Sequence, residues 1–381
     1  MHLTSGGCHA LKVGILDPLG RHGGLHYYTD GLATGLSESG IETCVYILDV
    51  TGEGEDKAYR SKVAFGGIYG GDPAWLRGLR FAKGLLRAFW DARANQIDII
   101  HIHCFHYDIR EILTAVLTIL FGMKLVVTLH DIDSFGHSDG RLGRWSITRI
   151  ARGLIVHNQF SLRAIRSGAK LSAPVAVIPH GHYVDAYPAP PERGAAREAL
   201  GLQGDAFLAL FFGNPRAEKG LDLLTDALIA RPDLPIVLVV AGKMRPEKVS
   251  ELQALGTGLL RGRLHVNGKH ISDEDAEAYY RASNLVVVPY RRIYESGVTI
   301  MAQSFARAIL CSDLPPLIAS VGDTGRVFRA GDSESLSDAL SLAYDDADNL
   351  DDLGQRGQEK AREERNWRDI GNATAKFYAS L

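Results

Sequence analysis

The sequence contains few cysteines and lacks a secretory signal. Its 381 residues include four cysteines, which are scattered and form no C-x-x-C pair. This pattern indicates neither a disulfide framework nor a thiolate zinc site, and it fits a reducing compartment. The first residues, MHLTSGGCHALK, have no apolar core of the kind found in signal peptides. We therefore expect a cytoplasmic protein, acting in the cytosol or at the inner face of the membrane. The cysteines are Cys8, Cys44, Cys104 and Cys311.

The sequence also lacks a strong charge imbalance and a segment long enough to span a membrane. The formal net charge is −3, and 23% of the residues are charged. This composition has no basic signature of a nucleic-acid-binding protein, so we expect no nucleic-acid partner. The longest apolar run, residues 112–127, is interrupted by Gly122 and Lys124 and is too short to cross a bilayer. We predict that it forms a buried helix followed by a strand.

Short apolar strands alternate with helical segments along most of the chain. This order predicts α/β architecture with parallel, doubly wound sheets and helices on both faces. The composition changes at PAPPERG, residues 188–194, which indicates a linker. We therefore predict two Rossmann-like domains, residues 1–188 and 195–365, whose facing strand ends form a cleft. Residues 53–73 are polar and rich in glycine, which predicts a loop. The predicted strands are 11–16, 43–48, 97–103, 125–129, 153–156, 175–178, 207–212, 236–241, 264–267, 285–288 and 308–311.

The segment from residue 284 to residue 313 has the pattern of a phosphate site. A continuous apolar run, 285–288, predicts a buried strand, and Ser296 and Gly297 lead into a helix after a short polar loop. In a parallel sheet, this arrangement points the backbone N–H groups of Gly297 and Val298, and the positive end of the helix, beyond the strand. A phosphate group is the simplest ligand. An ordinary strand-to-helix connection without a ligand explains the pattern equally well.

Cations and glycines follow the first predicted strand of each domain. Arg216 and Lys219 stand in GNPRAEKGLDLL, at the start of a predicted helix. The helix dipole disfavours cations there, so their presence favours a diphosphate ligand over simple solvation. Gly23 and Gly24 follow the first strand of the chain and allow the backbone to approach a ligand closely, although a tight turn explains them as well.

Histidines gather at the ends of the predicted strands of the first domain. Their spacing matches no zinc-binding pattern, so we predict no metal. Asp131 and Asp133 could hold a divalent ion, but a capping role suits Asp131 better. His130, in TLHD, is the candidate for contact with a substrate, and a core histidine bonded to the backbone is the alternative. The histidines are His101, His103, His130, His180 and His182.

Taken in order, these segments resemble the motifs of GT-B fold glycosyltransferases, and most of all glycosyltransferase family 4. The resemblance implies transfer of a sugar from a nucleotide-sugar donor, UDP- or GDP-linked, with retention and with neither a catalytic metal nor another cofactor. It also implies a donor site in the second domain, an acceptor site in the first, and a C-terminal helix, residues 366–381, that crosses back to the first domain. The segments are the Gly-Gly turn, TLHD, ARGLIVHNQFS, VIPHGHY, FFGNPRAEKGLDLL, HVNGKHISDEDAEAYYRASNLVVVPY and ESGVTIMAQSF.

The resemblance assigns roles to the donor-binding residues. Arg216 and Lys219 resemble the pair that holds the donor diphosphate, and Gly23 and Gly24 approach the same phosphates. His130 corresponds to the histidine that reaches the transferred sugar.

Other positions are assigned to the sugar hydroxyls and the nucleotide. Glu295 matches the first glutamate of the family's E-x7-E motif, which contacts sugar hydroxyls, and Ser296, Gly297 and Val298 meet the phosphates. Lys269 and His270 border the nucleobase. Gln303 stands where the family has its ribose-binding second glutamate. Its amide can form hydrogen bonds with hydroxyl groups, but it lacks the negative charge of a carboxylate. This departure, and a glycine one position early, leave the nucleotide, the role of Glu295 and retention open.

The predicted helix 75–95 carries cations beside large apolar residues. Such a helix either docks on an anionic membrane or buries its apolar side in the domain. Docking would favour a lipid-linked saccharide acceptor in polysaccharide or cell-envelope glycan synthesis, and a free saccharide is the other acceptor class. The cations are Arg77, Arg80, Lys83, Arg87 and Arg93, and the apolar residues are Leu79, Phe81, Leu85, Leu86, Phe89 and Trp90.

Two other classes of protein fit the same two-domain plan. A catalytically weakened nucleotide-sugar-binding protein would explain Gln303, and it would bind the donor without transfer. A nucleotide-sugar epimerase would change the donor without any acceptor.

Overall fold

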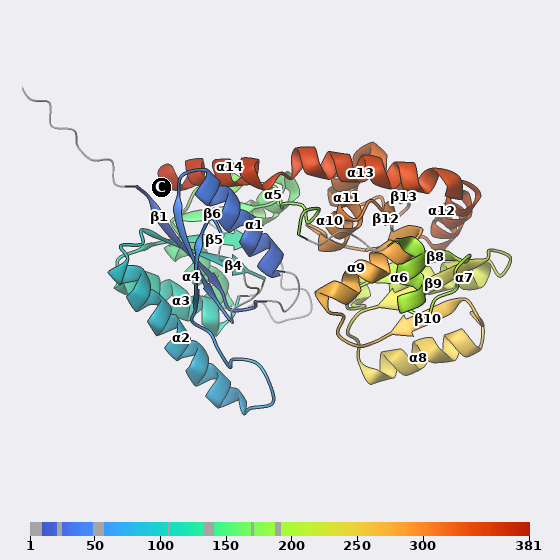
Figure 1. The fold of residues 1–381 in the computed structure, drawn as a ribbon, viewed down its shortest axis with the longest axis horizontal. Coiled ribbons are helices and arrows are strands. Elements are labelled where there is room, and N and C mark those ends of the chain that lie inside the picture. Colours follow the sequence, from blue (N-terminus) through green and yellow to red (C-terminus); the bar gives the residue numbers. More distant parts are fainter. Residues whose placement is uncertain are drawn as a thin grey trace, which may run out of the picture. The chain divides into compact units, whose positions relative to one another are not determined.

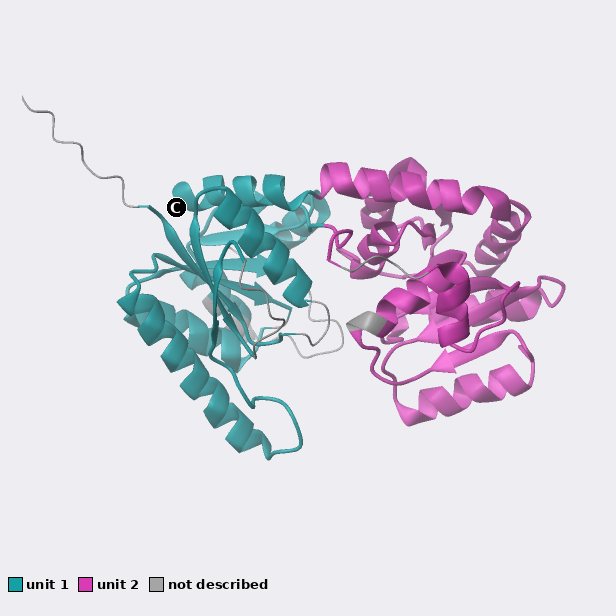
Figure 2. Ribbon diagram, viewed as in Figure 1, with its two compact units in different colours: residues 1–181, 366–381 teal, residues 182–365 magenta. Residues whose placement is uncertain are grey.

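The computed structural model describes residues 10–20, 25–48, 57–105, 107–132, 141–168, 171–186 and 192–381. The chain divides into two compact units, residues 1–181 with 366–381 and residues 182–365 (Figure 2). The division falls before the predicted linker because residues 182 and 183 are bonded to the second unit. The His182 N–H donates to the Arg365 carbonyl at 3.0 Å, and the Tyr183 N–H donates to Ser304 Oγ at 2.9 Å.

Unit one is built on a seven-stranded sheet in the order β3-β2-β1-β4-β5-β6-β7, in which each pair of neighbours is parallel. The five residues after Lys12 in β1 are fully or nearly fully buried, as expected for a strand covered on both faces. The strands are β1 (Lys12–Asp17), β2 (Glu42–Ile47), β3 (Arg60–Val63), β4 (Ile99–Cys104), β5 (Lys124–Leu129), β6 (Gly153–Val156) and β7 (Val175–Val177).

Helices cover both faces of this sheet (Figure 1). The C-terminal helix α14 packs along α1 through glycines, since a Cβ on Gly371 would lie 2.1 Å from the Gly35 carbonyl carbon. α2, α3 and α4 form a second layer, in which α3 contacts both of the others. The helices are α1 (Leu25–Glu38), α2 (Ala74–Ala94), α3 (Ile109–Leu120), α4 (Arg141–Ile150), α5 (Gln159–Gly168) and α14 (Trp367–Ala379).

Two sequence-based expectations about unit one are wrong. Residues 53–73 contain the edge strand β3, whose four residues are all exposed and therefore give no apolar signal. The run 112–127 does form a helix and a strand, but α3 is not a buried helix. Ile109 and Leu120 are 73% and 72% exposed, because the solvent side of this helix is also apolar.

Unit two repeats the plan with a six-stranded parallel sheet in the order β10-β9-β8-β11-β12-β13. The short strand β13 lacks a strong apolar pattern and was not predicted. The strands are β8 (Phe207–Phe212), β9 (Ile236–Ala241), β10 (Leu264–Asn267), β11 (Leu285–Val288), β12 (Ala308–Ser312) and β13 (Arg326–Phe328). The helices are α6 (Arg193–Ala199), α7 (Leu221–Ala230), α8 (Pro246–Thr257), α9 (Asp273–Ala282), α10 (Gly297–Ser304), α11 (Pro315–Val321), α12 (Ser333–Asp345) and α13 (Leu350–Glu364), with short 3₁₀ helices η1 (Ala217–Lys219), η2 (Gly322–Thr324) and η3 (Ala347–Asn349).

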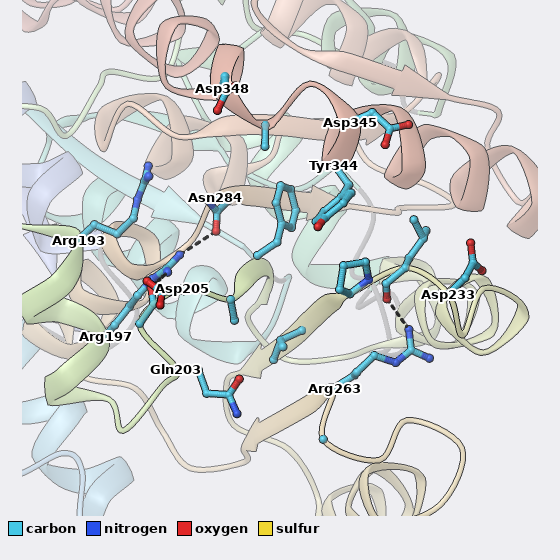
Figure 3. Close-up of a pocket in the computed structure, with 18 of the residues that line it drawn as sticks. Arg193, Arg197, Gln203, Asp205, Asp233, Arg263, Asn284, Tyr344, Asp345 and Asp348 are labelled. Atoms are coloured by element: carbon cyan, nitrogen blue, oxygen red, sulfur yellow. Dashed lines mark hydrogen bonds between the residues drawn. The ribbon is translucent and has the colours of Figure 1, made fainter.

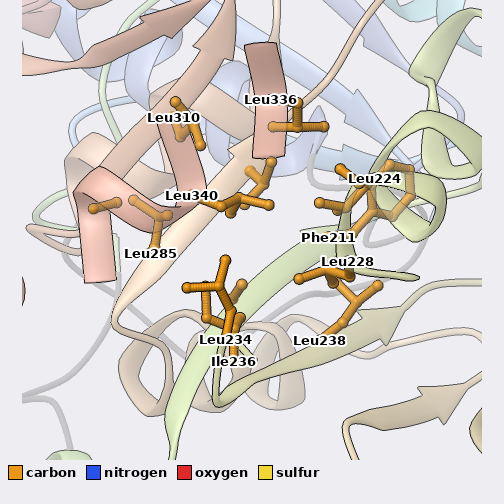
Figure 4. Packing of buried hydrophobic residues seen from close by; sticks show 14 of the residues in the cluster. Phe211, Leu224, Leu228, Leu234, Ile236, Leu238, Leu285, Leu310, Leu336 and Leu340 are labelled. Carbon is orange, nitrogen blue, oxygen red and sulfur yellow. The ribbon is translucent and has the colours of Figure 1, made fainter. Parts of the chain in front are cut away.

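Alternate residues of the unit-two strands enter two apolar cores, one on each face of the sheet. Phe211 in β8 and Leu238 in β9 pack with Leu224 of α7 and Leu340 of α12 on one face (Figure 4). Leu210, next to Phe211, belongs to the core on the other face. The predicted fold class, two Rossmann-like parallel-sheet domains, is confirmed. No helix among the described residues is long and apolar enough to cross a membrane.

Candidate functional site

Loops at the carboxyl edge of the unit-two sheet carry the predicted donor-binding residues. Parallel strands end at the same edge, so the loops after β8, β10 and β11 all emerge there. Arg216 and Lys219 follow β8, Lys269 and His270 follow β10, and Glu295 follows β11. The structure therefore brings these sequence-distant segments to one side of unit two.

The loop between β8 and α7 places the Lys219 ammonium against the end of the strand. Gly213 has a φ of +99°, and a Cβ there would lie 2.8 Å from Lys219 Nζ, so glycine leaves the space that the ammonium group fills. The same ammonium lies 5.5 Å from the centre of the Tyr290 ring, which follows β11. Gly220, at φ +65°, lets this loop approach Pro289, whose carbonyl oxygen would lie 2.0 Å from an added Cβ. Lys219 thus bridges the ends of two adjacent strands.

An arginine that sequence reasoning missed ties these two loops together. Arg291, after β11, donates to both carboxylate oxygens of Asp222 in α7, at 2.8 and 2.7 Å, and to the Ala217 carbonyl. Its N–H donates to the Glu218 carbonyl at 2.7 Å. The Arg291 guanidinium lowers the pKa of the Asp222 carboxyl. These bonds fix the loop that carries Lys219, while Arg216 is exposed at the start of η1.

Helix α10 begins at the same edge. Ser296 is buried and caps the helix, because its Oγ accepts from the Thr299 N–H at 3.3 Å. Gly297, the first helical residue, is exposed, and Val298 is half-buried. Helix N-termini attract anions through their N–H groups and dipole, so the geometry suits a phosphate beside Gly297.

Glu295 lies directly before this cap and is almost fully buried. Its Oε1 lies 3.4 Å from Arg365 Nη1, and the side chains of both residues are about one tenth exposed. The other Arg365 terminal nitrogen donates to Ser320 Oγ at 3.1 Å. Arg365 is the last residue of unit two and was not predicted, since nothing in the sequence connects positions 70 residues apart.

Gln303 lies inside unit two and is 1% exposed. Its Nε2 donates to the Ser320 carbonyl at 3.1 Å, and its Oε1 has no hydrogen-bond partner among the described residues. Binding of the ribose by Gln303 stays a prediction.

We expect Gln303→Glu to destabilise the protein rather than improve donor binding. A carboxylate cannot donate to the Ser320 carbonyl, and burial of a mispaired polar group costs about 2 kcal/mol. A loss of this size lowers the melting temperature by about 4–8 °C. Gln253→Glu, on the exposed face of α8, is the matched control and should leave the melting temperature nearly unchanged. Tighter donor binding with unchanged stability would show instead that position 303 faces the ribose.

Lys269 and His270 are both exposed after β10. The Lys269 N–H donates to Asn267 Oδ1 at 3.1 Å, and Asn267 in turn donates to the Tyr279 hydroxyl at 2.8 Å. These bonds hold the loop and leave the side chains of Lys269 and His270 at the surface. Their assignment to the nucleobase stays a prediction.

Histidines from consecutive strand ends meet at the carboxyl edge of the unit-one sheet. His130 Nε2 lies 3.3 Å from His103 Nδ1, and His130 Nδ1 lies 3.3 Å from His157 Nε2. Burial, and then the neighbouring histidines, hold the pKa of His130 well below its ordinary value. His157 was not singled out from the sequence, because the resemblance covered its segment without indicating a contact with His130.

The other histidines of the sequence prediction have different surroundings. His101 is a core residue bonded to the Tyr378 hydroxyl at 2.5 Å and to Thr128 Oγ1 at 2.7 Å. His182 belongs to unit two. No group of three or more His, Cys, Asp or Glu side chains in the described part of the chain is arranged to hold a metal ion. Gly23, Gly24 and Asp133 lie outside the described residues.

A cavity of about 1420 Å³ lies at the opposite edge of the unit-two sheet (Figure 3). Its lining includes Phe207, where β8 begins, and Asn284, which precedes β11. Arg197 donates to Asn284 Oδ1 and to the Ala282 carbonyl, and Arg263 donates to three backbone carbonyls. The protein's own oxygen atoms therefore engage both of these guanidinium groups. Because the cavity lies at the opposite edge of the sheet, it is distinct from the candidate phosphate site.

Two family profiles match successive parts of the chain. The profile described as Glycosyltransferase Family 4 matches residues 22–186, and the profile described as Glycosyl transferases group 1 matches residues 206–346. The two matches fall one in each half of the chain, before and after the predicted linker.

Individual proteins show the same similarity. The lipopolysaccharide core biosynthesis mannosyltransferase LpsB of Rhizobium meliloti is 28% identical over 228 residues, which cover 57% of this chain and 64% of LpsB, less than two thirds of its length. A D-inositol 3-phosphate glycosyltransferase of Streptomyces scabiei is 26% identical over 328 residues, covering 79% of this chain and 72% of the relative. The solved structure of Anabaena HepE in complex with UDP and glucose has a TM-score of 0.75 and 20% identity, and covers 97% of this chain and 100% of HepE.

Proposed function

Because this chain is a GT-B glycosyltransferase similar to family 4, we propose that it transfers a sugar from a UDP- or GDP-linked donor to a saccharide or lipid-linked saccharide. The observation that carries the donor class is the Lys219 ammonium, held against Gly213 and the Tyr290 ring at the sheet edge where α10 also begins. A cation next to a helix N-terminus suits a diphosphate. The UDP and glucose bound to HepE, and the names of LpsB and the Streptomyces relative, support a nucleotide-sugar donor and a saccharide product.

The proposed reaction is metal-independent and retains configuration at the sugar C1. The bond between C1 and the diphosphate oxygen breaks, and the acceptor hydroxyl oxygen forms its bond to C1 on the same face. The hydroxyl proton passes to the departing phosphate oxygen. Lys219, Arg216 and the N-terminus of α10 stabilise the negative charge that develops on the diphosphate. In this proposal unit two binds the donor and unit one binds the acceptor.

A thermal-shift screen tests the donor class. The protein is heated with UDP, GDP, ADP or dTDP and with their common sugar conjugates. A ligand at about 100 times its dissociation constant stabilises the folded state by about 2.7 kcal/mol, a readily visible shift. We expect a shift with the UDP or GDP series. Binding without transfer to any acceptor would favour a weakened nucleotide-sugar-binding protein, and a changed sugar without an acceptor would favour an epimerase.

A surface on α2 and α3 supports a membrane-linked acceptor. α2 buries Leu85 and Phe89 in unit one, yet its other side exposes large apolar residues one turn apart together with Lys83 and Arg87. α3 contacts α2 and exposes an apolar side of its own. Apolar residues interspersed with cations suit an anionic bilayer. We define this apolar surface as Trp75, Leu79, Leu86, Trp90, Ile109, Val116, Ile119 and Leu120.

We propose that this apolar surface docks the enzyme on the inner face of the membrane, where lipid-linked acceptors are available. The double variant Leu79→Glu with Leu120→Glu should bind vesicles of phosphatidylglycerol and phosphatidylethanolamine at least tenfold more weakly. Each buried apolar side chain contributes about 1.5–3 kcal/mol, and a carboxylate is repelled by the anionic lipid. Sedimentation with the vesicles measures the change. Leu342→Glu, an equally exposed leucine on α12, is the control. Wild-type protein that does not sediment with these vesicles would contradict the proposal.

A further inference from the structure

Three histidines of unit one form a directed chain of hydrogen bonds. His103 lies in β4, His130 follows β5 and His157 follows β6. The chain runs from His103 Nδ1 to His130 Nε2 and from His130 Nδ1 to His157 Nε2, with both distances 3.3 Å. It ends at the backbone, where His157 Nδ1 lies 3.1 Å from the Ile178 carbonyl oxygen.

The carbonyl at the end of the chain determines where each proton lies. A carbonyl oxygen only accepts, so the Nδ1 of His157 must carry its proton. In a neutral imidazole the other nitrogen is then an acceptor, and His130 must donate to it from a protonated Nδ1. His130 Nε2 is therefore an acceptor, which receives its hydrogen bond from His103 Nδ1. One backbone carbonyl thus fixes the tautomer of three rings.

The rings are also fixed in orientation. Phe105 stacks on His130 with the ring centres 4.5 Å apart and the planes 8° from parallel. Tyr28 meets the edges of His103, His130 and His157 at 5.1, 4.9 and 5.6 Å. Tyr28 is itself 2% exposed, so its ring cannot move aside without opening the core. His130 therefore cannot turn its ring to exchange its two nitrogens.

His157 and His130 differ in access to solvent. His157 is 5% exposed, whereas His130 taken as a whole residue is half-buried. Of these two residues, His130 is therefore the more accessible to a substrate, and His157 acts through it.

We propose that His157 is a positioning residue that holds His130 as the Nδ1-protonated tautomer and so presents Nε2 as a hydrogen-bond acceptor. An acceptor nitrogen binds a hydrogen-bond donor such as a sugar hydroxyl. On His130 Nε2 this donor would replace the His103 N–H. The same nitrogen repels a phosphate oxygen or a carbonyl, which only accept. The assignment of a sugar to this position rests on the proposed transferase function. The tautomer itself does not.

The tautomer is measured directly by long-range proton–nitrogen NMR of the full chain labelled at the histidine nitrogens. We expect His130 to show a protonated Nδ1 and an unprotonated Nε2 at neutral pH, with its signals assigned by their loss in His130→Gln. A wild-type His130 that carries its proton on Nε2 would overturn the proposal. This measurement needs no variant at position 157.

Two substitutions at position 157 separate positioning from packing. His157→Phe removes the acceptor and should convert His130 to a mixture of tautomers. It should also lower kcat/KM by about 10–100-fold for the nucleotide sugar found in the thermal-shift screen, because small misplacements of a contact group cost this much. His157→Gln retains an acceptor oxygen and should restore both the tautomer and most of the activity. A His157→Phe protein whose His130 stays fully Nδ1-protonated would refute the proposal. If wild-type His130 shows the expected tautomer but the His130→Ala variant keeps its activity, the proposed contact between His130 and the sugar is refuted instead.

Discussion

Lys219→Ala is expected to lower kcat/KM for the nucleotide-sugar donor by about 100-fold. The ammonium group fills the space over Gly213 and lies beside Tyr290, at the edge where both strands end. A charge-assisted hydrogen bond contributes about 1.5–3 kcal/mol, and 2.7 kcal/mol corresponds to 100-fold. The diphosphate gains negative charge as the sugar leaves, so kcat should fall together with donor affinity. Steady-state kinetics and isothermal titration with the nucleoside diphosphate measure the two effects.

The stability of this variant should change little, because a half-exposed lysine contributes little to folding. Lys124→Ala is the matched control. Lys124 is exposed at the amino end of β5 in unit one. Its substitution by alanine removes one positive charge, as Lys219→Ala does, but at the end of the strand opposite to the carboxyl edge. Equal losses of kcat/KM in Lys219→Ala and Lys124→Ala would indicate that the change in net charge is the cause. Unchanged kinetics in Lys219→Ala would remove this residue from the phosphate site.

Gly371→Ala is expected to destabilise unit one by about 3 kcal/mol. A methyl group at this position of α14 would lie 2.1 Å from the carbonyl carbon of Gly35 in α1. The contact is backbone on backbone, so no side chain can rotate to relieve it and the helices must separate. Overpacking of this kind costs about 1–3 kcal/mol and sometimes more. Urea unfolding followed by circular dichroism measures the loss.

Gly78→Ala supplies the control for helix propensity. Gly78 lies in α2, and a Cβ there would meet nothing within 4 Å. Alanine is favoured over glycine in a helix by about 0.5–1 kcal/mol, so this variant should be slightly more stable than the wild type. Opposite signs for the two substitutions would show that the effect at 371 comes from the α1–α14 contact. A neutral Gly371→Ala would mean that α14 detaches from α1 at little cost.

Much of the fold follows from local patterns that the sequence displays. The apolar runs 207–212, 236–241 and 285–288 are strands with the same bounds in the structure, because a strand buried on both faces needs a continuous apolar run. The position of Lys219 beside its strand end also follows locally, since only a short loop separates it from β8. The edge strand β3 was missed because its exposed residues need no apolar side chains.

The sequence by itself determined the fold class, the family resemblance and the segments that emerge at the strand ends. These features depend on residues close together in the chain, whose periodicity and spacing can be read directly. Only the tertiary structure decided which side chains meet there: His157 with His130, Arg365 with Glu295, and the Gln303 amide with the interior of unit two. It also decided that α3 exposes an apolar side. Such contacts depend on sheet order and helix packing, which join residues that no local pattern connects.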